Sequence, residues 1–365
     1  MPGRTALRTI VASRAFATAF RIHPPVRLHR LLLPGVAVAT LSCAAARATP
    51  PAAVGTPATF APDTVVEETA LDGCVRLHHL WKPQLAALGQ RAAGQPRDAR
   101  IARLVAAAYR PHAPFWAGYA GLDDEAAFVR WAEPRLRELE TDPRRTIPIT
   151  VEPGGMIAEA TRRVAEFTGR PRACSDWYVV FGPGWTNLGG LRDLGMVVDF
   201  LGMPQDRGVE DFRAVLPHEV AHVAWDPAHR DDPDEGTLLG RIVSEGFATW
   251  FADLYWGDSL SAAQALGYTD DEWDWAVAHE RELWEAAVPV LGSREREVLD
   301  RFAAVRERPL PGGPGKVGYF LGHRIVDAYV RRHGADSWRA LYEMPYARIL
   351  EASGYGAAPG GPAAG

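Results

Sequence analysis

One pentapeptide, His218-Glu219-Val220-Ala221-His222, constrains this chain more than any other feature of its sequence. In an α-helix, residues four apart lie on the same face, so both imidazoles would point the same way and bind one cation. The flanking residues are largely apolar, which predicts a buried helix. Two histidines and a glutamate in an apolar surround are costly without a partner, and a metal ion is such a partner.

A second motif offers the third ligand that such a site needs. Glu245 lies in Ser244-Glu245-Gly246-Phe247-Ala248, within another long apolar stretch that predicts a helix. A loop from Pro227 to Glu235 would let the two helices pack as an antiparallel pair, with Glu245 facing the histidines. Two histidines and one carboxylate around Zn²⁺ leave a fourth position open, as in catalytic zinc sites. The sequence therefore predicts one Zn²⁺ held by His218, His222 and Glu245.

Catalytic roles follow from the same arrangement. Glu219 lies beside the ligand face and would act as general base on a metal-bound water, whose pKa the ion lowers to about 7. A group from a later helix would stabilise the developing oxyanion. Tyr319 and His323, four residues apart in a predicted helix, are the candidates, with core packing and solvent exposure as their respective alternatives.

Two acids are candidates to orient the ligand histidines. Asp226 and Asp253 are the nearest acids in sequence to the two ligand helices, and either would accept a hydrogen bond from an imidazole. Helix capping or solvation is the competing role for each.

The two motifs resemble those of gluzincins, metallopeptidases in which H-E-x-x-H is followed by a glutamate ligand on a downstream helix. More narrowly, the chain is similar to a bacterial family of predicted zinc-dependent proteases, domain of unknown function 2268. The similar region spans roughly Thr146 to Ser353, and the matching stretches are His218 to His222, Val243 to Ala248 and Gly318 to Gly322. The resemblance implies a zincin-like fold and hydrolysis of peptide bonds, without defining a substrate.

Two other classes of function stay open. The first is a non-catalytic, zinc-stabilised binding or chaperone module. Glu219 speaks against it, because a purely structural site closes its fourth position with another ligand. The second is non-peptidase metal chemistry, since non-haem iron oxygenases also use two histidines and a carboxylate. Those sites are usually mounted on β-scaffolds, whereas both motifs here are predicted to be helical.

The amino terminus is typical of a targeting segment. Residues 1–48 contain seven arginines and no acid, and Leu31 to Leu41 is an apolar run too short to span a bilayer. Ala46-Arg47-Ala48 offers small residues to a signal peptidase. We expect residues 1–48 to be a signal peptide that exports the chain to the periplasm or the cell exterior. A lipoprotein signal ending before Cys43 and an organellar transit peptide are the alternatives.

Charge limits the partners. The formal net charge is -5, and removing the basic leader leaves a still more acidic body, which is a poor surface for nucleic acid. The expected partner is a peptide or protein substrate. We expect no nucleic acid, and membrane attachment only through a lipid on Cys43. The oligomeric state is left open.

The predicted fold is α+β and zincin-like. A small mixed sheet occupies the amino half, the carboxyl half is predominantly helical, and the active-site helix lies at the junction. Residues 49–64 are predicted to be a flexible linker, residues 65–353 the metallopeptidase domain and residues 354–365 a disordered tail. Cys74 and Cys174 form either a disulfide or two buried thiols.

The sequence pattern also places individual elements. Strands are predicted at Thr146–Val151, Trp177–Phe181 and Gly195–Leu201. The last of these would pair with an extended peptide if it lay at a sheet edge. Helices are predicted at 77–88, 99–109, 123–140 (with a kink or break at Pro134), 156–168, 209–225, 236–256, 269–290, 295–306, 315–333 and 336–351.

Overall fold

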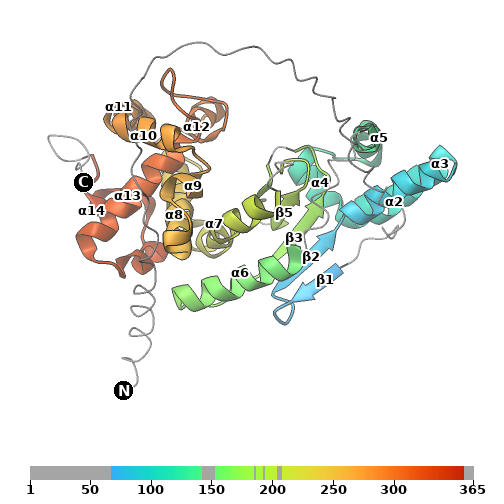
Figure 1. Cartoon of the computed structure of the whole chain (residues 1–365), viewed down its shortest axis with the longest axis horizontal. Helices are drawn as coiled ribbons and strands as arrows, with labels where there is room; N and C mark the ends of the chain where they lie inside the picture. The colour runs from blue at the N-terminus through green and yellow to red at the C-terminus, as the bar shows by residue number, and fades with distance from the viewer. Residues whose placement is uncertain (1–66, 142–152, 185, 192–193, 204–207, 357–365) are drawn as a thin grey trace, which may run out of the picture. The chain divides into compact units, whose positions relative to one another are not determined.

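The computed structural model describes residues 67–141, 153–184, 186–191, 194–203 and 208–356. The expected signal peptide (1–48), the linker (49–64), the strand Thr146–Val151 and most of the tail lie outside these residues. The described elements follow the colours of Figure 1, from the blue and green amino half to the yellow and red carboxyl half.

A five-stranded mixed sheet lies in the amino half, as the sequence predicted. Its spatial order is β1-β2-β3-β5-β4, with the three inner strands parallel and each outer strand antiparallel to its neighbour. In β2, buried Val75 and Leu77 flank exposed Arg76, which is the period of two that a strand requires. The strands are β1 (Glu67–Ala70), β2 (Val75–His79), β3 (Ser175–Val180), β4 (Leu188–Gly190) and β5 (Met196–Asp199).

A disulfide joins Cys74 to Cys174, so of the two states left open by the sequence the cystine is the one present. The two residues directly precede β2 and β3, which are parallel neighbours. The Ser175 backbone N–H also donates to the Cys74 carbonyl oxygen at 2.9 Å. Parallel strands cannot be joined by a short hairpin, so this cross-link fixes where the two strands start relative to each other.

In this half one predicted element is partly wrong, and one question that the sequence left open is answered. The segment predicted as a helix from Leu77 begins instead as strand β2, and helix α2 starts only at Trp81. The strand predicted around Gly195–Leu201 exists as β5, but it pairs with β3 on one side and β4 on the other. Its backbone groups are therefore already paired, and it has no free edge for an extended peptide.

The helices of the amino half cover the sheet. One core cluster joins Val180 and Val197 of the sheet to aromatic residues such as Trp116 and Phe128. Pro134 lies inside α5 without ending it, so the predicted break is absent. The elements are α2 (Trp81–Ala92), α3 (Arg97–Leu104), η2 (Val105–Tyr109), η3 (Arg110–His112), α4 (Ala113–Ala120), α5 (Glu125–Thr141) and α6 (Pro153–Thr168).

The carboxyl half is predominantly helical, as predicted. The long helices expected at 269–290 and 336–351 are each divided, the first at His279. In the described ranges, no helix is both long enough and apolar enough to cross a bilayer. The elements are α7 (Gly208–His229), α8 (Leu238–Trp256), η6 (Gly257–Ser259), α9 (Ala262–Leu266), α10 (Asp270–Ala278), α11 (Glu280–Ala287), η7 (Val288–Val290), α12 (Arg296–Ala303), α13 (Val317–His333), η8 (Ser337–Glu343) and α14 (Tyr346–Ser353).

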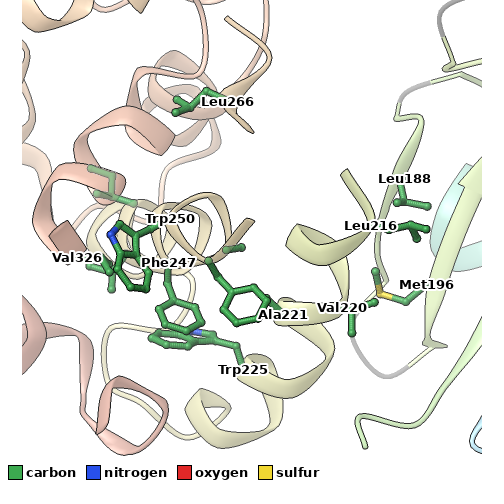
Figure 2. Packing of buried hydrophobic residues seen from close by; sticks show 14 of the residues in the cluster. Leu188, Met196, Leu216, Val220, Ala221, Trp225, Phe247, Trp250, Leu266 and Val326 are labelled. Carbon is green, nitrogen blue, oxygen red and sulfur yellow. The ribbon is translucent and has the colours of Figure 1, made fainter. Parts of the chain in front are cut away.

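Helix α7 connects the sheet to the other helices. Figure 2 shows Leu216 and Val220 of α7 beside Leu188 and Met196 of the sheet, and all four belong to one core cluster. On another side of the helix, the Trp225 ring stacks on a phenylalanine of α8 with 4.1 Å between ring centroids. Because apolar contacts hold α7 on both sides, the histidine pair that it carries has a fixed position at the junction.

Candidate metal centre

Three side chains from α7 and α8 converge on one point. His218 and His222 lie one helical turn apart on α7, and Glu245 reaches them from α8. The Nε2 atoms of the two imidazoles are 3.2 Å apart. Glu245 Oε2 lies 3.3 Å from Nε2 of His218 and 3.2 Å from Nε2 of His222. The structure therefore brings together the three residues that the sequence proposed as ligands.

The spacing of these atoms fits a zinc ion. Zinc holds nitrogen and oxygen ligands at about 2.0–2.1 Å in a tetrahedron, so any two ligand atoms are about 3.3 Å apart. The three observed separations match that edge length. The cluster is also buried, because only 8% of His218 and 6% of Glu245 is exposed. Two imidazole nitrogens and one carboxylate oxygen that converge in a buried site are a ligand set that favours a cation at their centre.

The outer nitrogens of both imidazoles face polar side chains. His218 Nδ1 lies 3.5 Å from Thr249 Oγ1, whose hydroxyl in turn donates to the Glu245 carbonyl oxygen at 2.8 Å. His222 Nδ1 lies 3.3 Å from Ser244 Oγ and 3.7 Å from Asp226 Oδ1. With a metal bound, each Nδ1–H would donate to these oxygens and each Nε2 lone pair would face inward, which is the tautomer that a metal ligand needs. Of the two predicted orienting acids, Asp226 therefore lies at the site.

Arg241 fixes the carboxylate from its other side. Its Nη1 donates to Glu245 Oε1 at 2.8 Å, while Glu245 Oε2 faces the histidines. Burial alone would raise the pKa of Glu245, but His222, His218 and Arg241 together hold it well below its ordinary value. The same contact raises the pKa of Arg241. Glu245 is therefore an anion that presents one oxygen to the centre.

Glu219 and Tyr319 lie around the same centre. Only 7% of Glu219 is exposed, and burial raises the pKa of its carboxyl group. The Tyr319 ring lies nearly parallel to the His218 ring, with 6.1 Å between centroids. Burial, followed by the charge on Glu245, raises the pKa of Tyr319 well above its ordinary value. The phenol is therefore neutral at physiological pH, and its hydroxyl is hydrogen-bonded to Glu245.

His323 does not join this cluster. Its Nε2 lies 3.3 Å from Asp253 Oδ2, and its ring meets Trp273 edge to face. Asp253 follows Glu245 by two helical turns, about 12 Å along α8. The structure thus separates Tyr319 and His323, which the sequence treated as equivalent, and it pairs Asp253 with His323 rather than with a ligand histidine.

Two glycines set the distance between α8 and α13. A Cβ atom on Gly246 would lie 2.2 Å from the Cα of Gly322, and one on Gly322 would lie 1.9 Å from the carbonyl oxygen of Ile242. Any side chain at either position would push the helices apart. This contact explains how Tyr319, one turn before Gly322, comes close to Glu245, the residue before Gly246.

The sequence did not single out Arg241, Thr249 or Lys316. Arg241 and Thr249 lie four residues before and after Glu245, so helical spacing alone would have found them. The ammonium of Lys316 lies 5.3 Å from the centroid of the Tyr319 ring and lowers the pKa of Glu219. Spacing alone would place Lys316 near Tyr319, but its proximity to Glu219 depends on tertiary packing, because Glu219 lies on another helix.

These observations define a class: an α+β protein with a buried site of two histidines and one carboxylate on a helix pair. The family model of the gliding motility protein GldB, a lipoprotein family, matches residues 213–357. The matched region contains most of α7 and all of α8 and α13, and therefore every residue of the cluster. No match was found among curated proteins or among solved structures.

The match corrects the interpretation of the sequence. The resemblance to the family of predicted zinc-dependent proteases, domain of unknown function 2268, is wrong, because the matching family is that of a gliding motility protein. The assignment as a gluzincin-type metallopeptidase, a hydrolase that cleaves peptide bonds, is wrong for the same reason. H-E-x-x-H and a distant glutamate specify how ligands are placed, and the same placement serves more than one function.

Proposed function

We propose that this chain is an exported, non-catalytic binding protein in which one Zn²⁺ ties α7 to α8. The ligands would be His218, His222 and Glu245. The single observation that carries the proposal is the equilateral arrangement of their three inward-facing atoms, each 3.2–3.3 Å from the other two. The similarity to a gliding motility lipoprotein supports a binding role at the cell envelope in place of peptide hydrolysis.

A metal in this position would stabilise the fold directly. It would replace the proton between His222 and Glu245 in the metal-free cluster and make all three side chains ligands of one cation. Because α7 also packs on the sheet, a tie between α7 and α8 connects the two halves of the core. A zincin-like fold remains part of the proposal, supported by the order of the sheet, the histidine helix and the glutamate helix along the chain.

Export is supported by the lipoprotein family and by the Cys74–Cys174 disulfide, since disulfides persist in oxidising compartments. Attachment of a lipid to Cys43 would place the protein at a membrane surface. Mass spectrometry of the mature protein tests this directly: a lipidated amino-terminal Cys43 supports anchoring, and an unmodified terminus after Ala48 contradicts it.

Zinc content tests the metal site. The full chain, purified without added metal, is expected to carry about one zinc per molecule, and His222→Ala or Glu245→Ala is expected to carry none. The matched control is His323→Ala, which removes another buried histidine outside the cluster and should keep its zinc. Zinc-free wild-type protein that also fails to take up Zn²⁺ would contradict the proposal.

A separate experiment tests the proposal that the protein is not a catalyst. Glu219→Gln should retain both zinc and thermal stability, because Glu219 is not among the three converging ligands. Zinc-loaded wild-type protein should leave a broad peptide library intact. Cleavage that a chelator suppresses and that Glu219→Gln abolishes would overturn a purely binding role.

A further inference from the structure

Lys316 is an unusual residue for this chain. Of 40 basic residues only two are lysines, Lys82 and Lys316. The Lys316 ammonium lies over the ring of Tyr319, which itself lies parallel to His218. Within the described residues it makes no ion pair with a carboxylate. Its positive charge lowers the pKa of Glu219. A cation is thus placed beside the metal ligands without a carboxylate of its own.

The backbone at Lys316 supports a role for this side chain. Lys316 precedes α13 with φ 55° and ψ 27°, in the left-handed region. Only three non-glycine residues in the described part of the chain have positive φ, and the other two lie together in the turn between β1 and β2. Glycine adopts this conformation freely, whereas a lysine there is strained. Backbone strain kept at a site suggests that the side chain is needed there.

Arg241 provides a second positive charge, next to the carboxylate of Glu245. One of its amino groups donates to Glu245, but 52% of its side chain is exposed, so further N–H donors face solvent. A divalent ion held by two neutral imidazoles and one carboxylate keeps a positive charge. Lys316 and Arg241 add to it. Of the nearby acids, Glu219 lies inside the site. Asp226 lies on the outer side of the His222 ring, and Glu235 accepts a hydrogen bond from the Tyr346 hydroxyl.

We propose that the metal centre is a receptor for a carboxylate of a partner protein, which would take the fourth coordination position with Lys316 and Arg241 as charge partners. This inference rests on the metal-binding function proposed above. A purely structural zinc site would have a fourth protein ligand, whereas a binding site needs a fourth position that a partner can occupy. A carboxylate suits the centre since it is anionic and can coordinate through one oxygen while the other faces the charge of Lys316 or Arg241.

The experiment uses the full chain loaded with Co²⁺, whose visible absorption reports its ligands and geometry. Three short alanine peptides are titrated in. The first carries one internal glutamate and an amidated end, and the second has no acidic side chain but a free carboxyl end. The third replaces the glutamate with glutamine and is amidated. A carboxylate ligand is expected to change the spectrum with the first or the second peptide, which identifies its source, and not with the third.

Variants of the two lysines test the charge partner. Lys316→Asn removes the charge but keeps a residue that tolerates the left-handed conformation, and it should weaken peptide binding roughly 10-fold. Lys316→Arg should restore most of the affinity. Lys82→Gln is the matched control, because Lys82 lies over Trp81 in the amino half, and it should change nothing.

The possible failures are distinguishable. If Co²⁺ does not bind the wild-type chain, the proposed metal function fails. If Co²⁺ binds and no carboxylate peptide changes the spectrum, or all three do so equally, the metal function stands and the receptor inference is wrong. Equal affinities for wild type and Lys316→Asn would remove Lys316 from the site.

Discussion

Two buried carboxylates of this molecule are satisfied in opposite ways. Asp199, at the end of β5, accepts hydrogen bonds from the backbone N–H groups of Gly182, Gly184 and Leu201 and from the Tyr119 hydroxyl, at 2.7–3.0 Å. Glu245 faces two imidazole nitrogens with one oxygen and an arginine with the other. The first carboxylate has four hydrogen-bond donors of the protein, whereas the second lies where we propose a metal ion.

The two clusters differ in the kinds of atoms that meet. Around Asp199 every contact joins a donor to an acceptor, so the cluster closes the loop after β3 onto β5. Burial raises the pKa of Asp199, and its four donors oppose that rise. Around Glu245 two imidazole Nε2 atoms and one carboxylate oxygen converge, each 3.2–3.3 Å from the other two. This convergence of three side chains that can act as ligands is the feature on which the proposed metal site rests.

The largest expected effect concerns the sheet, which should be stable without metal. Replacing both Cys74 and Cys174 by alanine frees a loop whose ends are 100 residues apart. Loop-closure entropy predicts a loss of about 4.7 kcal/mol in the free energy of unfolding. Urea denaturation with and without Zn²⁺ measures it. The loss should be the same in both conditions, and a loss that Zn²⁺ reverses would contradict the separation of the two regions.

The next effect is the stabilisation by metal. At a free Zn²⁺ concentration 1,000 times its Kd, the wild-type chain should gain about 4 kcal/mol in the free energy of unfolding. Glu245→Gln keeps the size of the side chain but removes the charged ligand, and it should gain far less. The same denaturation experiment gives the answer. A gain of equal size in this variant would show that Zn²⁺ binds elsewhere.

A smaller effect is expected at Asp199. In Asp199→Asn an amide N–H₂ group replaces one oxygen and faces two donors, so buried hydrogen bonds are lost at a cost of about 3 kcal/mol. Tyr119→Phe removes a single donor from the same cluster and should cost about 1 kcal/mol. Neither variant should alter the affinity for Zn²⁺, which calorimetry measures. A weaker Zn²⁺ affinity in Asp199→Asn would mean that the two clusters are coupled.

The last effect is the pH dependence of metal binding, about 1.4 kcal/mol in the free energy of binding for each pH unit. In the metal-free protein burial lowers the pKa of His222, but Glu245 and Asp226 outweigh it and hold the pKa well above 6.5. This proton stabilises the metal-free fold fully below pH 6.5, and the contribution is lost as pH rises through the raised pKa. Zn²⁺ must displace the proton, so below that pKa its affinity should rise about tenfold per pH unit. If the affinity for Zn²⁺ did not change between pH 6 and pH 8, this prediction would be contradicted.

Local patterns predicted the helical half and failed in parts of the sheet. The apolar spacing in α7, α8 and α13 is long enough to define helices, and their positions are close to those expected. Strand β2 is only five residues long and runs directly into α2, so the helical pattern of the following residues concealed its alternation. Strand β4 has three residues, too few for any period, and only its pairing with β5 defines it.

The same limit applies to the site. Spacing along one helix placed His218 with His222, and it would have found Arg241 and Thr249. Spacing also placed Tyr319 and His323 on one face of α13, which is correct. It could not show that His323, one turn after Tyr319, lies beside Asp253 and away from the three converging side chains. That outcome depends on where α13 crosses α8, which is a property of tertiary packing.

The crossing of α8 and α13 has a mechanical consequence. Because their backbones touch at Gly246 and Gly322, the helices can change their crossing angle about that point but cannot approach further. Glu245 lies next to the pivot, so a change of angle hardly moves it. Lys316 lies six residues before Gly322, about 9 Å along the axis, so a 10° change would displace it by about 1.6 Å. A partner that tilts α13 would therefore reposition the ammonium while the metal ligand stays in place.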